Sequence, residues 1–171
     1  MALPSKVLPG YVATLYAQSG ATPTVLTGSY NSGQLATLAN VSAIAITANQ
    51  LLVEAVPAFG QDDAVASFAV AGARQSDKIP VQAAPSSMTI TAAWNPSDTV
   101  IQQVRTDAYN GTTDRTYVVA AFDTVGGTNV IYYAFNARVG NFQIDAQPGA
   151  EAKAVFTLHP RAGQYGWSNS V

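Results

Sequence analysis

Within residues 87–111 the spacing of the apolar residues changes from every second position, typical of a strand, to the spacing of a helix. This change constrains the fold more than any other feature of the sequence. Residues 87–94 alternate as in a half-buried strand, whose apolar face holds Met88, Ile90, Ala92 and Trp94. A helix start follows: Asn95 is a cap candidate, Pro96 suits the first helical position, and Asp98 places an acid in the first turn. Asn110-Gly111 is a helix stop. The sequence therefore predicts a strand followed by one helix of about 13 residues.

The predicted helix is amphipathic. Its apolar residues recur at helical spacing and are Val100, Ile101, Val104 and Ala108. We expect these side chains to form the core face of the helix, because an apolar stripe on a surface helix packs against the rest of the domain.

Most of the remaining chain favours β-structure. Short apolar runs bounded by turn residues predict strands at 12–17, 44–46 with 51–56, 65–70, 115–122, 129–139 continuing to 145, and 152–158. About seven strands with hairpin-type connections and a single helix predict a mainly β fold. We expect an antiparallel β-sandwich or open barrel with one α-helix packed at its edge.

The 171 residues are predicted to form a single domain, 1–171, with several segments poor in apolar residues. These segments are an N-terminal arm at about 1–10, loops at about 20–40, 57–64 and 72–85, and a polar, glycine-containing C-terminal tail at 161–171. We expect the arm and the tail to be mobile or to order only on a neighbour, because such segments bury too little apolar surface to fold alone.

The charge of the chain is low and dispersed. Charged residues make up 11 % of the sequence, less than half the usual share of about 25 %, and the formal net charge is −2. The eight Lys and Arg residues are scattered singly, so no basic footprint for nucleic-acid phosphates is present. A surface this poor in charge repels copies of itself weakly, which favours self-association.

The sequence predicts no catalytic residue, no metal site and no cofactor, so we do not expect an enzyme. It contains no Cys and one His, His159, whose place beside Pro160 at a strand end favours an exposed or hydrogen-bonded structural role. Asp62-Asp63 is best interpreted as a solvated acid pair, because an oxygen-ligand metal site needs more ligands than two. No phosphate loop, dinucleotide fingerprint or zinc motif occurs in the chain.

Two further observations bear on the class of protein. No run approaches the roughly 20 apolar residues of a membrane span, and we expect no export signal at the N-terminus. Tyr132, Tyr133 and Phe135 leave a carbohydrate-binding β-sandwich module as an alternative. Strand alternation places successive members of this group on opposite faces, which favours a core and interface role for them.

The pattern of elements resembles the major tail tube protein of long non-contractile-tailed, lambda-like bacteriophages. The resemblance rests on Ala93-Trp94 followed by a proline, the helix closing at Asn110-Gly111, and the strand opening at 113–117. It also rests on the return strand through 135–139, the last strand at 152–158, and Leu8-Pro9-Gly10 leading into Thr14-Leu15-Tyr16.

The resemblance implies a structural virion protein, assembled in the host cytoplasm, whose hexameric rings stack into the tail tube through which genomic DNA passes without specific binding. The implied partners are further copies of the chain and the tape measure, tail terminator and distal tail proteins of the phage. A secretion-system tube protein of the same general fold is a second alternative. We expect a polar or acidic lumen and ring-to-ring contacts through Phe59, Asp62, Asp63, Ile79 and Trp167.

Overall fold

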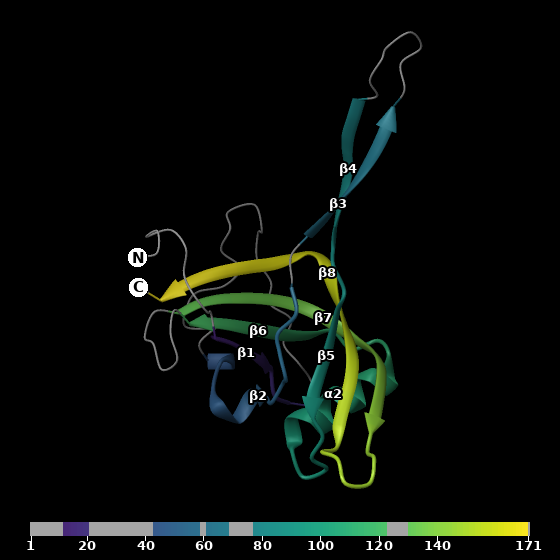
Figure 1. Cartoon of the computed structure of the whole chain (residues 1–171). Coiled ribbons are helices and arrows are strands. Elements are labelled where there is room, and N and C mark those ends of the chain that lie inside the picture. Colours follow the sequence, from purple (N-terminus) through teal and green to yellow (C-terminus); the bar gives the residue numbers. More distant parts are fainter. Residues whose placement is uncertain (1–11, 21–42, 59–60, 69–76, 123–129, 171) are drawn as a thin grey trace, which may run out of the picture.

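Six antiparallel strands form one strongly bent sheet in the order β2-β1-β6-β7-β8-β5 (Figure 1). The computed structural model describes residues 12–20, 43–58, 61–68, 77–122 and 130–170. The sheet strands are β1 (Val12–Ala17), β2 (Gln50–Leu51), β5 (Met88–Ala93), β6 (Arg115–Phe122), β7 (Val130–Asp145) and β8 (Lys153–Ser170). Helix α2 (Thr99–Asn110) packs at the edge of this sheet, so the predicted mainly β fold class with one edge helix is confirmed.

The segment 50–54 connects the two edge strands, β1 and β5, in one half of the sheet, so that this half curls into a barrel. Its first two residues form β2 and pair with β1. The following residues cross to the opposite edge strand, where the Glu54 amide donates to the Thr91 carbonyl at 2.9 Å and the Ala93 amide donates to the Leu52 carbonyl at 2.8 Å. In this half both edge strands therefore have a hydrogen-bonding partner, and no row of backbone groups is left open there.

The main core lies inside this barrel, beneath α2. It contains Leu15, Met88, Ile90, Tyr117, Val119, Phe135, Phe156 and Leu158, together with three helix residues. The helix residues Val100, Ile101 and Val104 are 6 %, 1 % and 0 % exposed, and Ala108 is half-buried against the same core. The apolar stripe of α2 thus covers the inner face of the sheet.

The outer face of β6 is also buried. Val118 and Ala120 point away from the barrel and pack with Tyr16, Ala134 and Ile44 in a second, smaller cluster. Because β6 contacts apolar side chains on both faces, its sequence is a nearly continuous apolar run rather than an alternating one.

Helix α2 begins three residues later than its sequence predicts. Its N-cap is Asp98, whose side chain accepts a hydrogen bond from the Val100 amide at 2.8 Å. Asn95 instead accepts from the Ser97 amide at 2.9 Å, and this Asx-turn lies before the helix. The stop at Gly111 is confirmed: its φ of 65° is left-handed, and its amide bonds to the Asp107 carbonyl at 2.9 Å.

Several segments differ from the sequence-based expectations. Residues 61–64 and 77–85, expected in loops, belong to strands β3 (Gln61–Phe68) and β4 (Asp77–Pro85). Residues 161–170, expected to be a mobile tail, continue β8 and pair with β7. Ile44 lies in a helical turn, and η2 (Thr47–Asn49) precedes β2, where the sequence predicts strand. The arm at 1–10 and most of the loop at 20–40 lie outside the described residues.

The core position of α2 gives a stability prediction. Val104→Asp places an unpaired carboxylate where the native side chain is 0 % exposed, so we expect no soluble folded protein. Val104→Ala should remain folded and lose about 1–3 kcal/mol of unfolding free energy.

The matched control is Thr106→Asp, on the exposed side of the same helix. Urea unfolding followed by circular dichroism measures all three variants. Equal stability of Val104→Ala and Thr106→Asp would contradict the assigned helix face.

Candidate assembly interface

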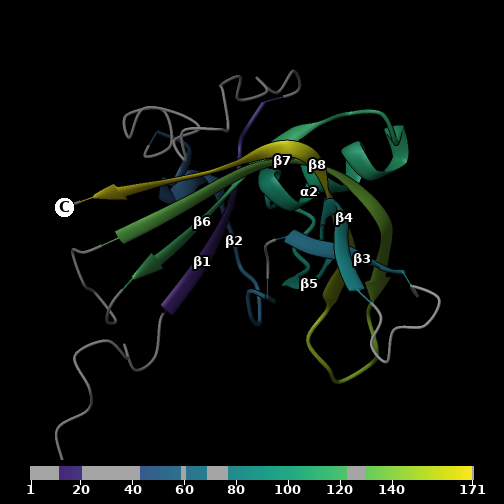
Figure 2. The same cartoon turned by 90° about the horizontal axis from the view of Figure 1, so that it is seen from above.

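Among the described residues, one half of the sheet has an edge without a paired strand on each side. In this half the strand order is β1-β6-β7-β8, and Figure 2 shows these four strands running alongside one another. β2 pairs only with Leu15 and Tyr16, so no described strand covers the outer edge of residues 12–14. β5 pairs only with residues 153–158 of β8, so no described strand covers the outer edge of 159–170. Unpaired backbone groups on an edge strand are a ready template for another strand.

A proline marks the start of the open part of β8. Pro160 lies opposite Ala137, and the ladder resumes at Tyr165 opposite Phe135, so residues 161–164 form an irregularity in the strand. Proline has no amide hydrogen and interrupts the ladder at this point. The β5–β8 ladder does not extend beyond Leu158, and β8 continues along β7 without β5.

Strands β3 and β4 form a two-stranded arm. They pair from Gln61 opposite Pro85 to Phe68 opposite Asp77, in a sheet of their own. Figure 1 shows this arm projecting well beyond the six-stranded sheet. An isolated two-stranded hairpin is at best marginally stable in water, so the arm is suited to pack on another molecule.

Arg115 and Asp107 form a buried ion pair that holds α2 against the sheet. Their side chains are 0 % and 2 % exposed. Arg115 Nε and Nη2 both donate to the Asp107 carboxylate, with Nη2 3.1 Å from Oδ1. Arg115 Nη1 donates to the carbonyl oxygens of Gln18 and, at 3.0 Å, Gly20. One guanidinium thus joins α2, the first residue of β6 and the chain that leaves β1.

Tyr117 is part of the same buried region. Its ring stacks on Phe135 with the centroids 6.0 Å apart. Burial raises the pKa of its hydroxyl above the ordinary value, the Asp107 charge adds to this rise, and the Arg115 charge opposes it. The hydroxyl is therefore neutral at physiological pH.

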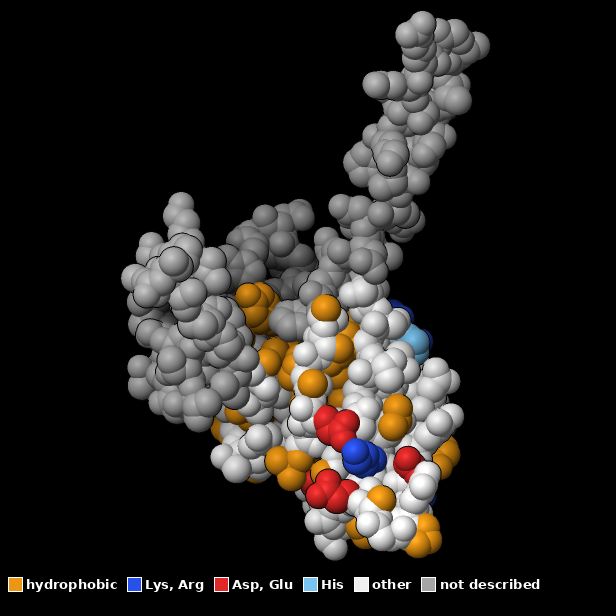
Figure 3. Space-filling model, in the orientation of Figure 1, with side chains coloured by type: hydrophobic (Ala, Val, Ile, Leu, Met, Phe, Trp, Pro, Cys, Tyr) orange, Lys and Arg blue, Asp and Glu red, His pale blue; other side chains and the backbone are white. Residues whose placement is uncertain are grey.

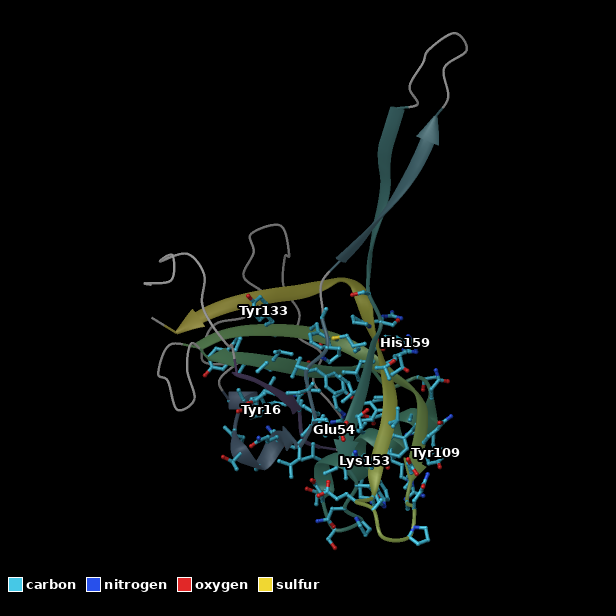
Figure 4. The ribbon with its side chains drawn as sticks, in the orientation of Figure 1. Tyr16, Glu54, Tyr109, Tyr133, Lys153 and His159 are labelled. Atoms are coloured by element: carbon cyan, nitrogen blue, oxygen red, sulfur yellow. The ribbon has the colours of Figure 1, made fainter. Side chains whose placement is uncertain are left out.

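An open groove of about 570 Å³ is lined by residues 13–14 of β1, the segment 50–54, residues 92–94 at the end of β5 and residues 151–153 at the start of β8. Glu54 and Lys153 form an ion pair at its rim and are 54 % and 40 % exposed. In Figure 4 these two side chains lie beside each other, and Figure 3 shows acidic side chains around a basic one on the same face. The hydrogen bond to Glu54, and then the Glu54 charge, raise the pKa of the Lys153 ammonium.

A second group of charges lies near the base of the arm. Asp114 accepts a hydrogen bond from Arg138 Nε at 2.6 Å and lies 3.6 Å from Arg161 Nε. His159, opposite Arg138 in the ladder, is exposed, and its Nδ1 lies 2.9 Å from Ser87 Oγ. This is the hydrogen-bonded, exposed position that the sequence favours for His159.

The residues predicted to make ring-to-ring contacts fall on the arm and on the open sheet edge. Asp62 and Asp63 lie on β3, Ile79 lies on β4, and Trp167 lies on β8 opposite Tyr133, while Phe59 lies outside the described residues. Sequence reasoning missed that these positions are strand residues. The alternation of Tyr165 and Trp167 with small polar residues is the signal that could have revealed the end of β8.

The described residues hold no cluster of three or more His, Cys, Asp or Glu side chains placed to bind a metal ion. Within the same residues, no helix is long and apolar enough to span a membrane.

No known protein family and no curated protein sequence matches the chain significantly. Solved structures do match it over nearly its whole length. A chain of the sheath/tube terminator of an extracellular contractile injection system (PVC, extended state) superposes with a TM-score of 0.61 at 11 % identity, covering 98 % of this chain and 99 % of that one. A chain of the PVC sheath-tube complex gives 0.56 at 13 %, covering 97 % and 94 %. The SPP1 tail tube gives 0.54 at 14 %, covering 93 % and 77 %.

The chain has the tail-tube fold. The likeness is one of backbone arrangement, because identities of 11–14 % carry no residue-level correspondence. At the level of fold, the resemblance to tail tube proteins inferred from the pattern of elements is confirmed. In this fold no described strand pairs with the outer edges of residues 12–14 and 159–170, and β3 and β4 form a sheet of their own.

The buried ion pair yields a second prediction. Asp107→Ala leaves the Arg115 charge buried without its partner, and we expect a loss of about 3–5 kcal/mol of unfolding free energy. Asp114→Ala removes the partly exposed pairs with Arg138 and Arg161, and we expect a loss of about 1 kcal/mol or less.

Urea unfolding monitored by intrinsic fluorescence compares the two variants. If Asp107→Ala is as stable as Asp114→Ala, the pair does not hold α2 in place.

Proposed function

We propose that this chain is a structural tail tube protein of a phage whose copies join through their sheet edges into hexameric rings, and that these rings stack into a conduit for genomic DNA. The observation that carries the proposal is the pair of open edges on opposite sides of the β1-β6-β7-β8 sheet. The open edge of β8 in one copy pairs with the open edge of β1 in the next. Because the two edges are different surfaces, the contact is head-to-tail and closes into a ring when the rotation permits.

In this proposal the β3–β4 arm makes the contacts between rings. It carries Asp62, Asp63 and Ile79, with Phe59 next to its first strand. Trp167 lies on the open edge of β8, so its place in the fold favours the seam between neighbours of one ring over a ring-to-ring contact.

The arrangement of cations supports passage of DNA without binding. Every Lys or Arg side chain that the structure places is already engaged: Arg115, Arg138, Arg161 and Lys153 in ion pairs, and Arg105 over the rings of Trp94 and Tyr109. Free clustered cations would hold phosphates by counterion release. A wall without them does not retain the DNA.

The proposed partners of the tube are the tape measure, tail terminator and distal tail proteins of the phage.

A tube of a contractile or secretion-type injection system is the second candidate function, and the likeness to the PVC sheath-tube structures favours it. Co-purification with a sheath protein of the same gene cluster would distinguish that candidate from a non-contractile tail.

Cysteine cross-linking tests the ring seam directly, because the chain contains no native cysteine. We introduce Thr14→Cys on the β1 edge and Ser168→Cys on the β8 edge and add a short bismaleimide. The expected result is a ladder that ends at the hexamer on a denaturing gel, because each copy is joined to two neighbours.

The control pairs Thr14→Cys with Thr106→Cys on the exposed side of α2, which should give monomers. Electron microscopy of the unmodified protein should show rings or tubes. Monomeric particles at high concentration, or equal ladders from both cysteine pairs, would contradict the edge-to-edge ring.

Removal of the arm tests stacking separately. Replacing residues 61–85 with a short Gly-Ser linker leaves the six-stranded sheet intact, because β3 and β4 form their own sheet. We expect this variant to form rings that do not stack, as measured by sedimentation and electron microscopy. Tubes as long as those of the unmodified protein would show that the arm is dispensable.

A further inference from the structure

Two clusters of opposite charge lie on the body of the described structure, apart from the charged residues of the β3–β4 arm. The first, here called the acidic groove, is the groove beside β2 and β5 with Glu54 and Glu151 among its lining residues. Asp145 lies opposite Lys153 in the β7–β8 ladder, and the carboxylates of Glu54, Glu151 and Asp145 all act on the Lys153 ammonium. These three carboxylates and one ammonium together carry a formal charge of −2, and the Arg105 guanidinium lies nearby, 5.9 Å from the ring centroid of the lining residue Trp94.

The lining of the acidic groove is largely apolar. It includes Leu51, Leu52, Val53, Ala92 and Trp94, of which Leu52 is 60 % exposed. An apolar floor under an acidic rim suits a long cationic side chain, because the aliphatic stem packs on the floor while the charged head reaches the rim.

The second cluster, here called the basic cluster, consists of Arg138, Arg161 and Asp114. The two arginines are 38 % and 46 % exposed, and they share one carboxylate, which leaves a formal charge of +1. It adjoins His159, which Figure 4 shows near the base of the arm, while Glu54 and Lys153 lie lower in the body.

The two clusters of one copy do not meet each other. Each cluster has one member on β8, and Lys153 and Arg161 are eight positions apart along that strand. At about 3.3 Å per residue this is up to about 26 Å along a hydrogen-bonded strand. The acidic groove and the basic cluster can therefore contact each other only when they belong to different copies.

We propose that the acidic groove of one copy receives the basic cluster of a copy in the adjacent ring. This inference rests on the proposed stacking of rings and names a contact additional to that of the arm. The two patches differ, so the contact is head-to-tail and repeats without limit along a tube. In a chain with 11 % charged residues, these clusters are the main electrostatic means of fixing which face of a ring meets the next.

Charge reversal with compensation tests the contact. Variant A carries Arg138→Glu and Arg161→Glu, variant B carries Asp145→Lys and Glu151→Lys, and variant AB carries all four changes. We expect A and B each to form rings but to lose stacking by about tenfold or more in sedimentation assays, because like charges then meet. AB restores the opposite signs and should stack as the unmodified protein does.

The control for added negative charge carries Thr106→Glu and Asn110→Glu on the exposed side of α2 and should stack normally. Thermal melts establish that each variant is folded. Should variant A fail to fold, Arg138→Gln with Arg161→Gln removes the positive charge without reversing it and should also weaken stacking.

The outcomes separate this contact from the proposed function. If the unmodified protein forms no rings, the ring proposal fails and this contact fails with it. If rings and tubes form but A and B stack normally, or if AB forms rings and remains unstacked, the groove contact alone is overturned.

Discussion

The buried pair of Arg115 and Asp107 is the interaction on which the arrangement of the other elements depends. Its two charges are almost completely removed from water, so they are tolerated only while both are present and well hydrogen-bonded. Arg115 also bonds to the carbonyls of residues 18 and 20, which fixes where the chain leaves β1. With α2, β1 and β6 held together at one point, the apolar stripe of the helix can cover the inner face of the sheet.

Among the described residues, the backbone groups of both sheet edges are hydrogen-bonded in one half of the sheet and have no paired strand in the other. In the barrel half, the segment 50–54 connects β1 to β5 and covers both edges. Past Pro160, β8 continues without β5, and residues 12–14 of β1 extend beyond β2. A protein that acted alone would gain from covering these edges as well, since open strand edges promote association with other chains. Edges left open on both sides of the same four strands instead suit a repeating contact between copies.

The chain has few charged residues, and its buried and surface charges act differently. Arg115 and Asp107 stabilise the fold from within, whereas the ion pairs of Lys153 and of Arg138 belong to the acidic groove and the basic cluster. Exposed ion pairs add little to stability but strongly affect the orientation of partners. A weakly charged surface also lets rings approach closely, because little like-charge repulsion opposes their stacking.

The sequence by itself determined the elements whose signals are local. The alternation in 88–93, the apolar stripe of α2, the stop at Gly111 and the run 115–122 depend on side chains a few residues apart, so pattern and capping chemistry predicted them. The N-cap was displaced from Asn95 to Asp98 because two good capping residues compete within four positions. Only the tertiary structure decided the pairing of 161–170 with β7, the closure of the barrel by 50–54, and the meeting of Arg115 with residues 18 and 20 across nearly a hundred positions. These are long-range contacts between polar or glycine-containing segments. Such segments have no periodic apolar pattern of their own, so the sequence does not predict their structure. They become ordered by pairing with the strands and helices that local patterns specify.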